Sequence, residues 1–322
     1  MMIKKVLAII VDFKSPQEAE NLSIQVSAQK LFEPEFGVAL QVVHFDNGNT
    51  PAVILSERQR SNQVCCERSE CNLGYAGALD EVIQRYRKQG LLFDAYWFLN
   101  SDLSMGANCL HRLLQVLNLH PQVGAVGPRI RDSRAVVKLE SQQVDKIWGA
   151  RGWISLLFGT TGMGDWRGGV LPPNSYIPGC SFLVRTEAYH QIGGMPLDYH
   201  LYYEETELCI RLKKGGWDLW VERGALVDHR VDSMKNGSPA RHFAYYFIRN
   251  NLLFWKRNYG FPIWFQFPRT LYVLLREVIA PLRRAKSIDE AWDRFQYSLA
   301  GLWDGILVAR SKPPVFERRL FK

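Results

Sequence analysis

The hydrophobic positions of the chain fall into short apolar runs that each end at a polar residue. Residues 6–11 and 95–99 are entirely apolar, and runs of this length are typical of strands buried on both faces of a parallel sheet. A helix-like stretch at 78–83 follows a glycine-rich turn, and an amphipathic segment at 208–212 precedes a Gly-Gly pair. The pattern predicts an α/β chain whose strands are buried.

A dense cluster of acidic residues lies directly before the amphipathic segment 208–212. Glu204, Glu205 and Glu207 place three carboxylates within four residues. Such a cluster is costly to desolvate unless its charges meet protons, cations or a metal ion, so it usually marks a functional edge of a fold. A solvated helix N-terminus is the alternative, because the helix dipole favours acidic residues there.

Two other apolar runs end at potential ligands. Asn100 and Asp102 follow the strand predicted at 95–99, and His229 follows the apolar run 225–227. Open α/β sheets bind ligands at the carboxyl ends of their strands, so Asp102 is expected where a metal or a phosphate binds. A strand-end Asp can instead cap a helix, and a lone His is more often a satisfied core or surface residue than a ligand.

Length and composition bound the class of protein. With 322 residues, 47% hydrophobic and 22% charged, the chain can bury the core of one large domain plus an appendage. The six cysteines form no C-x-x-C pair, which favours reduced thiols in a cytosolic protein over a zinc site. The apolar stretch at 6–11 is too short for a signal peptide and is expected to be the first strand.

The net charge is unevenly distributed. The formal excess of +8 lies wholly in residues 246–322, which hold 14 Lys or Arg and 6 Asp or Glu. No motif typical of nucleic-acid binding accompanies this basic region, so nucleic acid is not expected as a partner.

One segment of the basic region, 261–286, has its own pattern. Aromatic residues begin it, and apolar positions then share one helical face while Arg269, Arg276 and Arg283 recur on the other. This pattern is typical of a helix that lies on an anionic membrane surface, and a central arginine argues against a span. The alternatives are a helix packed on the main domain with its basic face in water and a contact within a homo-oligomer.

Taken in order along the chain, these features resemble a known family. The resemblance spans about residues 4 to 260. It is similar to family 2 glycosyltransferases of the GT-A (nucleotide-diphospho-sugar transferase) fold, closest in style to bacterial rhamnosyltransferase-like enzymes of surface-polysaccharide assembly, such as O-antigen synthesis. The motifs that carry it are the first strand 6–11, His44-Phe-Asp46-Asn47-Gly48-Asn49-Thr50, Asn72-Leu-Gly74-Tyr-Ala-Gly77, Asn100-Ser-Asp102, Pro178-Gly-Cys-Ser-Phe-Leu-Val-Arg185, Glu204-Glu205-x-Glu207-Leu-x-x-Arg211, His229 and Arg249-Asn250-Asn251.

The resemblance implies an α/β GT-A fold with a central, mostly parallel sheet. Residues 1–245 would form the catalytic domain, with a nucleotide-binding half at 1–103 and an acceptor half at 104–245. Residues 246–322 would form a basic, amphipathic helical region.

The donor-binding residues that the resemblance implies follow the strand ends and the glycine-rich turn. They are Asp12, Asp46, Asn47, Asn72, Gly74, Asn100 and Asp102. Backbone N–H groups of the glycine-rich turn at 72–77 would face the donor, since a helix N-terminus attracts anions. The Asn47-Gly48 pair is also an ordinary turn signal, and a glycine-rich turn before a helix is common without any ligand.

The resemblance also implies the catalytic groups. Glu205 takes the place of the Asp in the family's Glu-Asp pair and would accept the proton of the acceptor hydroxyl, helped by a pKa raised by its acidic neighbours. Asp102 matches the last Asp of the family's D-x-D motif, and His229 matches its downstream His. Together they imply a bound Mg²⁺ or Mn²⁺ that holds the departing diphosphate, with imidazole somewhat favouring Mn²⁺.

On the acceptor side, four residues are expected to contribute. Glu204 and Glu207 would position the acceptor or its loop, and Arg211 would pair with Glu207 across one helical turn. Trp166 would stack on a sugar from a mobile loop at 141–173, which is rich in glycine and tryptophan. The alternative is that these tryptophans are buried beneath an ordered flap.

The implied function is metal-assisted, inverting transfer of a hexose or deoxyhexose, with rhamnose favoured. The donor would be a dTDP- or UDP-sugar and the acceptor a lipid-linked glycan at the cytoplasmic face of the membrane. Another family 2 activity, such as galactosyl or N-acetylhexosaminyl transfer, is the first alternative. Glu205 stands where the family usually has Asp, and Asn100 replaces the first Asp of the D-x-D motif. These departures make a catalytically silent nucleotide-sugar-binding scaffold the alternative from a different class.

Overall fold

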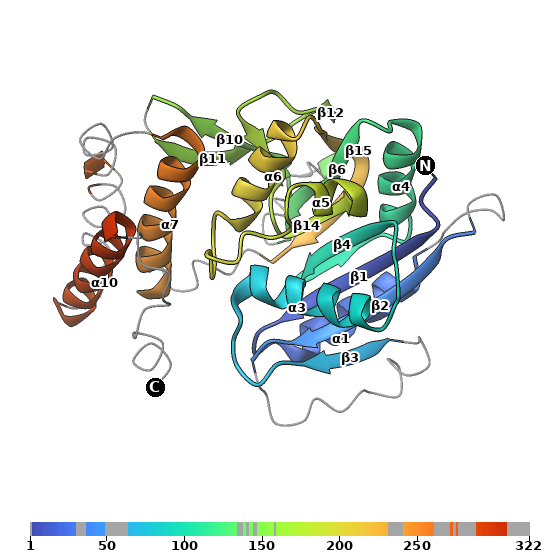
Figure 1. The fold of residues 1–322 in the computed structure, drawn as a ribbon, viewed down its shortest axis with the longest axis horizontal. Helices are drawn as coiled ribbons and strands as arrows, with labels where there is room; N and C mark the ends of the chain where they lie inside the picture. Colours follow the sequence, from blue (N-terminus) through green and yellow to red (C-terminus); the bar gives the residue numbers. More distant parts are fainter. Residues whose placement is uncertain are drawn as a thin grey trace. The chain divides into compact units, whose positions relative to one another are not determined.

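The chain forms two compact units in the computed structural model (Figure 1). The first unit contains residues 1–153, 162–200 and 204–231, and the second contains 154–161, 201–203 and 232–322. The structure describes residues 2–29, 37–48, 64–133, 138–139, 142–143, 147–157, 159–230, 241–260, 271–272, 275 and 288–307.

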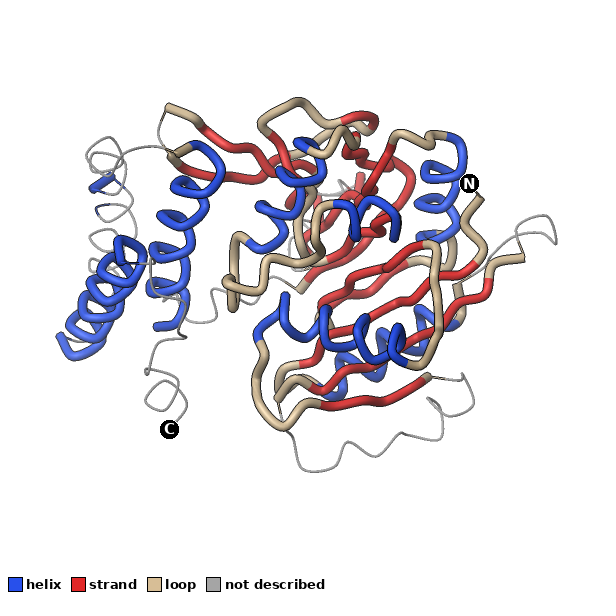
Figure 2. The backbone as a smooth tube through the Cα atoms, in the orientation of Figure 1, coloured by secondary structure: helices blue, strands red, loops and turns tan. Residues whose placement is uncertain are grey.

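A central sheet runs through the first unit (Figure 2). Its strand order is β12-β15-β6-β14-β4-β1-β2-β3, with β5 paired to β15 and β9 paired to β6. The four strands β3, β2, β1 and β4 are mutually parallel, and so are β6 and β15. The predicted α/β class with a mixed, mostly parallel central sheet is confirmed. The bounds of its strands are β1 Lys5–Asp12, β2 Ala39–Asp46, β3 Cys65–Arg68, β4 Ala95–Asn100, β5 Leu103–Met105, β6 Val123–Asp132, β9 Ile147–Gly149, β12 Gly169–Val170, β14 Ser181–Arg185 and β15 Asp218–His229.

The carboxyl ends of three neighbouring strands lie level with one another. Asp12 at the end of β1 is in register with Asp46 at the end of β2. Val11 is in register with Asn100 at the end of β4. Because parallel strands in register end together, the polar residues that follow them collect at one edge of the sheet.

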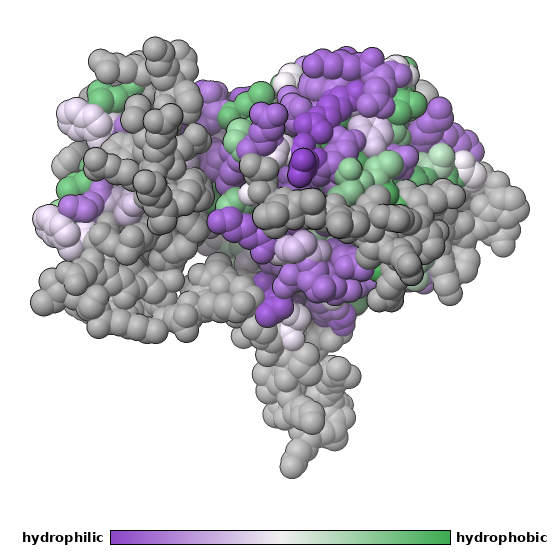
Figure 3. Space-filling model, turned by 90° about the horizontal axis from the view of Figure 1, so that it is seen from below, coloured by the Kyte–Doolittle hydropathy of each residue, from purple (hydrophilic) through white to green (hydrophobic). Residues whose placement is uncertain are grey.

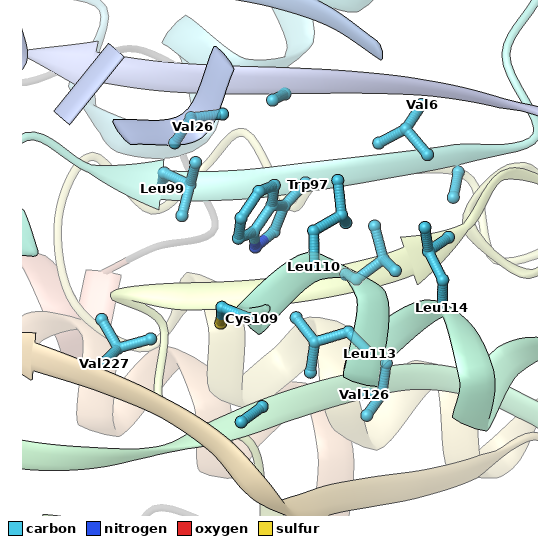
Figure 4. Packing of buried hydrophobic residues seen from close by; sticks show 14 of the residues in the cluster. Val6, Val26, Trp97, Leu99, Cys109, Leu110, Leu113, Leu114, Val126 and Val227 are labelled. Carbon is cyan, nitrogen blue, oxygen red and sulfur yellow. The ribbon is translucent and has the colours of Figure 1, made fainter. Parts of the chain in front are cut away.

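Helices cover both faces of the sheet, and the alternation along β4 shows why its sequence is apolar throughout. Trp97 and Leu99 join a cluster formed with side chains of α1 and α4 (Figure 4). Phe98 points the other way, where its ring lies 5.9 Å from that of Tyr189 on α5. Burial on both faces removes the polar alternation of a half-exposed strand. The helices of this unit are α1 Pro16–Ser27, α3 Gly74–Lys88, α4 Cys109–Leu119, α5 Thr186–Gln191 and α6 Glu204–Lys214.

The segment 141–173 differs from the expected loop, because much of its described part is strand. The strands β10 and β11 form a small sheet with β13, in the order β11-β10-β13. Two of its glycines, Gly152 and Gly162, lie directly against aromatic rings. A Cβ at Gly162 would lie 2.3 Å from Trp153 Cζ2, and one at Gly152 would lie 2.2 Å from Tyr176 Cζ. Glycine in a strand often marks such a close approach. The bounds are β10 Arg151–Ser155, β11 Thr160–Gly164 and β13 Ser175–Tyr176, and a two-stranded pair is formed by β7 Lys138–Leu139 and β8 Gln142–Gln143.

The second unit is built on α7 (Arg241–Tyr259), which packs against α10 (Ile288–Leu307). The Asn250 side chain of α7 donates hydrogen bonds to the backbone oxygens of Leu201 and Tyr202, at 2.8 and 3.0 Å. Two parts of the chain that lie almost fifty positions apart in sequence are thereby fixed to one another.

The expected division after residue 245 falls inside α7, and the two compact units divide the chain elsewhere. The segment 261–286, expected on a membrane surface, lies outside the described residues apart from 271–272 and 275. None of the helices that the structure describes is long and apolar enough to cross a membrane.

Candidate functional site

The turn between β4 and β5 brings Asp102 to the end of β15. His229 pairs with Leu103 across the two strands, and its Nε2 lies 3.2 Å from Asp102 Oδ1. The Asp102 side chain is about one-third exposed, whereas the His229 side chain is mostly covered. A strand follows Asp102 rather than a helix, so the helix-cap alternative does not apply. The structure thus brings together the two residues expected to bind a metal, which lie far apart in sequence.

The residues present fit a divalent cation, on two observations. Asp102 offers a hard carboxylate oxygen that remains accessible, and the Nδ1 atom of His229 is buried with no hydrogen-bond partner in the described part of the chain. An imidazole that already faces a carboxylate and lacks a competing partner is free to act as a ligand. No group of three or more His, Cys, Asp or Glu side chains within the described residues could hold a metal ion. The remaining ligands would therefore be phosphate oxygens and water, which Mg²⁺ commonly takes.

The acidic cluster forms the first turn of α6, and its members differ in environment. Glu204 is buried, and its Oε2 has no hydrogen-bond partner among the described residues. Burial and the neighbouring Glu205 raise the pKa of Glu204 well above its usual value. Burial also raises the pKa of Glu205, to about 7. The alternative of a solvated helix N-terminus therefore holds only in part, because the three acids begin α6 but Glu204 and Glu207 are buried and Glu205 is partly buried.

The turn at Pro178, Gly179 and Cys180 lies between Glu205 and the β4 strand end. A Cβ at Gly179 would come within 2.9–3.1 Å of three Glu205 side-chain atoms. On the other side, the Cys180 carbonyl accepts a hydrogen bond from Asn100 N at 2.9 Å. Burial, together with the charges of Asp102 and Glu205, raises the pKa of the Cys180 thiol. A candidate base, Glu205, and a candidate metal ligand, Asp102, therefore flank one turn.

Tyr75 belongs to this site, although no pattern in the sequence assigned it a role. Its hydroxyl donates to the Gly179 carbonyl at 3.1 Å. Burial raises the pKa of this phenol well above 10, and so do the charges of Cys180, Glu204, Glu205 and Asp102. The residue stands inside the Asn72–Gly77 motif, but nothing in the motif's spacing indicates which way its ring points.

Glu207 and Arg211 are engaged with each other and with the loop before α6. Both oxygens of the buried Glu207 are used, one by the Tyr199 hydroxyl and one by the Arg211 guanidinium. The expected pairing of Glu207 with Arg211 across one helical turn is present. These contacts suit a role in holding the loop at residue 199 rather than a direct contact with an acceptor.

Asn47, Asn72 and Gly74 belong to one hydrogen-bond network. Asn47 Nδ2 donates to Asn72 Oδ1 and to the Gly74 carbonyl, each at 3.1 Å. The N–H groups of Leu73 and Gly74 donate to Asn47 Oδ1 and Asn72 Oδ1. The Tyr75 N–H donates to the His200 carbonyl at 3.0 Å. Protein oxygens therefore already accept from the N–H groups of residues 73–75, and the expected contact of the turn 72–77 with a donor stays a prediction.

Asp12 lies at the expected strand end but is fully buried. One carboxylate oxygen accepts from Ser15 N and Oγ, and the other lies 3.2 Å from Nε2 of the equally buried His44. Burial opposes the charge on Asp12, but the hydrogen bonds from His44 and Ser15 prevail and lower its pKa. Burial alone would lower the pKa of His44, but its contacts with Asp12 and Cys66 raise it to about 9. Ser15 Oγ also lies 2.7 Å from Ser101 Oγ. Hydrogen bonds through these two hydroxyl groups therefore connect Asp12 to Ser101, the residue directly before Asp102.

Asp46 and Trp166 complete the set of expected site residues. Asp46 is buried and caps the following turn, accepting from Gly48 N at 2.9 Å. Trp166 is partly exposed, and its ring lies 5.1 Å from the Arg151 guanidinium. It lies outside the group of contacts that joins Asp102, Glu205 and Tyr75.

A mixed, mostly parallel sheet with helices on both faces and polar side chains at the carboxyl ends of its strands is the architecture of the GT-A glycosyltransferase fold. The comparisons agree: residues 39–193 match the model of glycosyl transferase family 2. The chain is an enzyme of the glycosyltransferase class, carries a family 2 domain, and is similar to rhamnosyltransferases.

Three known proteins illustrate the similarity. A curated N-acetylglucosaminyl-diphospho-decaprenol L-rhamnosyltransferase of Mycobacterium tuberculosis is 28% identical over 224 residues, which cover 64% of this chain and 71% of that protein. The mannosyltransferase PcManGT of Pyrobaculum calidifontis, solved with GDP-Man and Mn²⁺, has a TM-score of 0.51 and 14% identity, covering 96% of this chain and 79% of that one. GalNAc-T7, solved with UDP, GalNAc and Mn²⁺, has a TM-score of 0.53 and 11% identity over 85% of this chain, which spans only 56% of that structure. The two structures establish the fold.

Proposed function

We propose that the chain is an inverting glycosyltransferase that moves a hexose or deoxyhexose, rhamnose foremost, from a dTDP- or UDP-sugar to a lipid-linked glycan. The name of the curated relative, a rhamnosyltransferase acting on a diphospho-decaprenol acceptor, supports this choice of sugar and acceptor. Galactosyl or N-acetylhexosaminyl transfer is the alternative within the same fold.

One observation carries the proposal: Glu205, a carboxylate with a pKa of about 7, lies across a single turn from Asp102. A base of this pKa is largely ionised just above neutral pH and still basic enough to accept a hydroxyl proton. As the proton moves to Glu205, the acceptor oxygen bonds to the anomeric carbon from the face opposite the diphosphate. The bond to the diphosphate breaks and its electron pair leaves with that group, so the anomeric configuration inverts.

The departing diphosphate needs compensation for its charge. Asp102 and His229 would hold a divalent cation, which, when bound, supplies a Lewis acid for the phosphate oxygens. Asn100 brings an amide rather than a second carboxylate to this edge, so the protein ligands contribute one negative charge. We propose Mn²⁺ or Mg²⁺, with the imidazole ligand favouring Mn²⁺.

Two measurements test the proposal. Calorimetric titration with dTDP, UDP and GDP, with and without Mn²⁺, should show binding of one nucleotide that depends on the metal and is lost in Asp102→Ala. Transfer from the matching sugar nucleotide should fall by about 10²- to 10⁴-fold in Glu205→Gln, the usual contribution of a general base, while nucleotide affinity stays within about threefold of wild type.

A catalytically silent nucleotide-sugar-binding scaffold remains the rival, since Asn100 and Glu205 depart from the usual residues. Donor binding without hydrolysis or transfer on any acceptor would favour the scaffold. Failure to bind any nucleotide would overturn both proposals.

We further propose that transfer takes place at the cytoplasmic face of a membrane, where the protein is peripheral. The lipid in the relative's name and the basic region 246–322 support this proposal. Self-association through the same region stays a prediction.

A further inference from the structure

Tyr75, in the first turn of α3, makes hydrogen bonds to two segments that lie far along the chain. Its backbone N–H donates to the His200 carbonyl at 3.0 Å, and its hydroxyl donates to the Gly179 carbonyl at 3.1 Å. A tyrosine side chain is rigid and has only two torsions. The two hydrogen bonds therefore hold residue 200 and the turn at 178–180 at fixed places on one residue.

Both of these segments adjoin Glu205, the proposed base. The turn lies against its side chain, since a Cβ at Gly179 would come within 2.9–3.1 Å of the Cβ, Cγ and Cδ atoms of Glu205. His200 stands four residues before α6, and Glu205 is the second residue of that helix. Tyr75 therefore fixes the chain both at the side chain of the base and ahead of the helix that carries it.

The backbone from which the Tyr75 ring projects is itself fixed. A Cβ at the preceding residue, Gly74, would lie 2.2 Å from the His200 carbonyl oxygen and 2.8 Å from its Nδ1 atom. Such a close approach leaves the start of α3 no room to shift toward residue 200. The Tyr75 hydroxyl therefore extends from an anchored backbone, and its hydrogen bond can determine where the turn at 178–180 lies.

The surroundings of this hydroxyl strengthen its hydrogen bond. On the face of the molecule in Figure 3, the described surface is mostly hydrophilic, as expected where polar groups meet water. The site differs, because Glu204 is buried there. Burial raises the pKa of the Tyr75 phenol well above 10, and the charges of nearby acidic groups act in the same direction. The phenol therefore keeps its proton and remains a donor, and a hydrogen bond removed from water is stronger than one in it.

We propose that Tyr75 is a positioning residue for transfer, whose hydroxyl holds the turn at 178–180 against Glu205 and so fixes the carboxylate within reach of the acceptor hydroxyl. This role rests on the proposed function, in which Glu205 accepts the proton. A base that moves by a fraction of an ångström slows proton transfer, because the reaction depends on the distance between the reacting atoms. Binding of the nucleotide does not use the base and is unaffected.

The test begins with Tyr75→Phe, which removes only the hydroxyl. Transfer is followed from dTDP-rhamnose, or from UDP-galactose if the nucleotide titration selects UDP, to an N-acetylglucosaminyl-diphospho-polyprenol acceptor. We expect kcat to fall about tenfold, while the donor KM and the nucleotide affinity stay within about twofold of wild type. The melting temperature should fall by less than about 3 °C. A loss of nucleotide affinity as large as the loss of kcat would overturn the proposal.

A double-mutant cycle separates positioning of the base from a general structural effect. In Glu205→Gln the base is already absent, so adding Tyr75→Phe should lower the residual transfer by less than about twofold. A tenfold loss in both backgrounds would show that Tyr75 does not act through Glu205, and would overturn the proposal.

Tyr96→Phe is the matched control within the same compact unit. It removes a phenol hydroxyl that lies 3.0 Å from His190 Nε2, on the helix α5. This variant should keep the wild-type kcat. An equal loss of kcat in Tyr96→Phe and Tyr75→Phe would show that removal of any such hydroxyl has the same effect, and would overturn the assignment to Tyr75.

Failure of this role and failure of the proposed function give different results. Wild-type transfer in Glu205→Gln would exclude Glu205 as the base, and with it the proposed mechanism. Impaired transfer in Glu205→Gln with wild-type kcat in Tyr75→Phe would overturn only the role of Tyr75. A crystal structure of Tyr75→Phe tests the role without any substrate. We expect the Glu205 carboxyl group to move by about 0.5 Å or more, and an unchanged position would overturn the proposal.

Discussion

At the scale of single residues, the adjacent carboxylates of Glu204 and Glu205 lie in different environments. Glu204 is the more buried and has an oxygen without a hydrogen-bond partner among the described residues. Its pKa is raised well above its usual value by burial and by Glu205. Two neighbouring acids in one desolvated site ionise in sequence, and the one that ionises first is the available base. We propose Glu205 as this base, since its pKa is raised only to about 7.

The first prediction concerns the pH dependence of transfer. The base must be ionised, so kcat/KM should rise with pH through about 7, the pKa of Glu205. Because Glu204 is still protonated when Glu205 ionises, the midpoint of this rise in kcat/KM should shift by less than about half a pH unit in Glu204→Gln. A limb near the ordinary carboxyl pKa in wild type would exclude Glu205 as a base with a raised pKa.

The second prediction concerns the buried pair of His44 and Asp12. The pKa of His44 is raised to about 9, above its value of about 6.5 in an unfolded chain. Protonated His44 therefore stabilises the fold fully below about pH 6.5, and this contribution is lost as pH rises through about 9. Urea unfolding should show the free energy of unfolding falling by about 1–3 kcal/mol over that range. His44→Gln should flatten the curve, and an equal slope in the variant would contradict the assignment.

At the scale of elements, two glycines near the site allow a distant part of the chain to approach their backbone closely. Gly179 lies against Glu205, and Gly74 lies beneath the His200 carbonyl. Each places an element terminus in contact with a loop more than twenty residues away in sequence. A methyl group at either position would therefore act on the site rather than only on the local backbone.

The third prediction is that Gly179→Ala impairs catalysis more than stability. Its new Cβ would lie within 2.9–3.1 Å of Glu205 Cβ, Cγ and Cδ. The flexible end of the glutamate can move by a few tenths of an ångström, which displaces the base. We expect kcat to fall by about 10- to 100-fold with a change in melting temperature below about 4 °C. Wild-type kcat in this variant would show that the position of Glu205 is not limiting.

The fourth prediction compares two glycines with nearly equal backbone conformation. Gly74 has φ +72° and Gly90 has φ +75°, but a Cβ at Gly74 would lie 2.2 Å from His200 O whereas one at Gly90 meets nothing within 4 Å. Gly90→Ala should cost about 1 kcal/mol of stability, from φ alone. Gly74→Ala should cost at least about 2 kcal/mol more. Equal losses in chemical denaturation would show that the His200 contact does not constrain the turn.

At the scale of the whole molecule, the second compact unit includes residues 201–203, which directly precede α6, the helix that carries the proposed base. Tyr202 and Tyr203 have φ values of +69° and +74°, a conformation that costs about 1–3 kcal/mol for each residue and persists only when its surroundings hold it. The Asn250 side chain on α7 stabilises this conformation by donating hydrogen bonds to the backbone oxygens of Leu201 and Tyr202. The Asn251 side chain adds a bond to the Tyr203 hydroxyl at 2.7 Å.

The fifth prediction follows from this arrangement. Asn250→Ala removes the donors to Leu201 O and Tyr202 O, so the strained backbone before Glu204 relaxes. We expect kcat to fall at least tenfold and stability to fall by about 1–3 kcal/mol. Asn258→Ala is the matched control, because the Asn258 side chain donates within its own helix, to Phe254 O at 3.1 Å. If both variants keep wild-type kcat, the segment 201–203 does not position the base.

The sequence by itself determined the class of fold and the identity of the strand ends. The apolar run 95–99 predicted a two-sided buried strand because period and composition are local properties that burial on both faces imposes directly. The order of polar motifs predicted which positions meet at one sheet edge, since parallel strands in register end together.

Only the tertiary structure decided what each of those residues does. Asp12 is an internal partner of His44, the amides at 73–75 are bonded to protein, and Tyr75 lies at the turn beside Glu205. Gly152, Trp153 and Gly162 lie in strands of a small sheet rather than in a loop. The physical reason is the same in each case. Desolvation, hydrogen-bond partners and close ring contacts come from residues distant in sequence, and no local pattern encodes the distance between them.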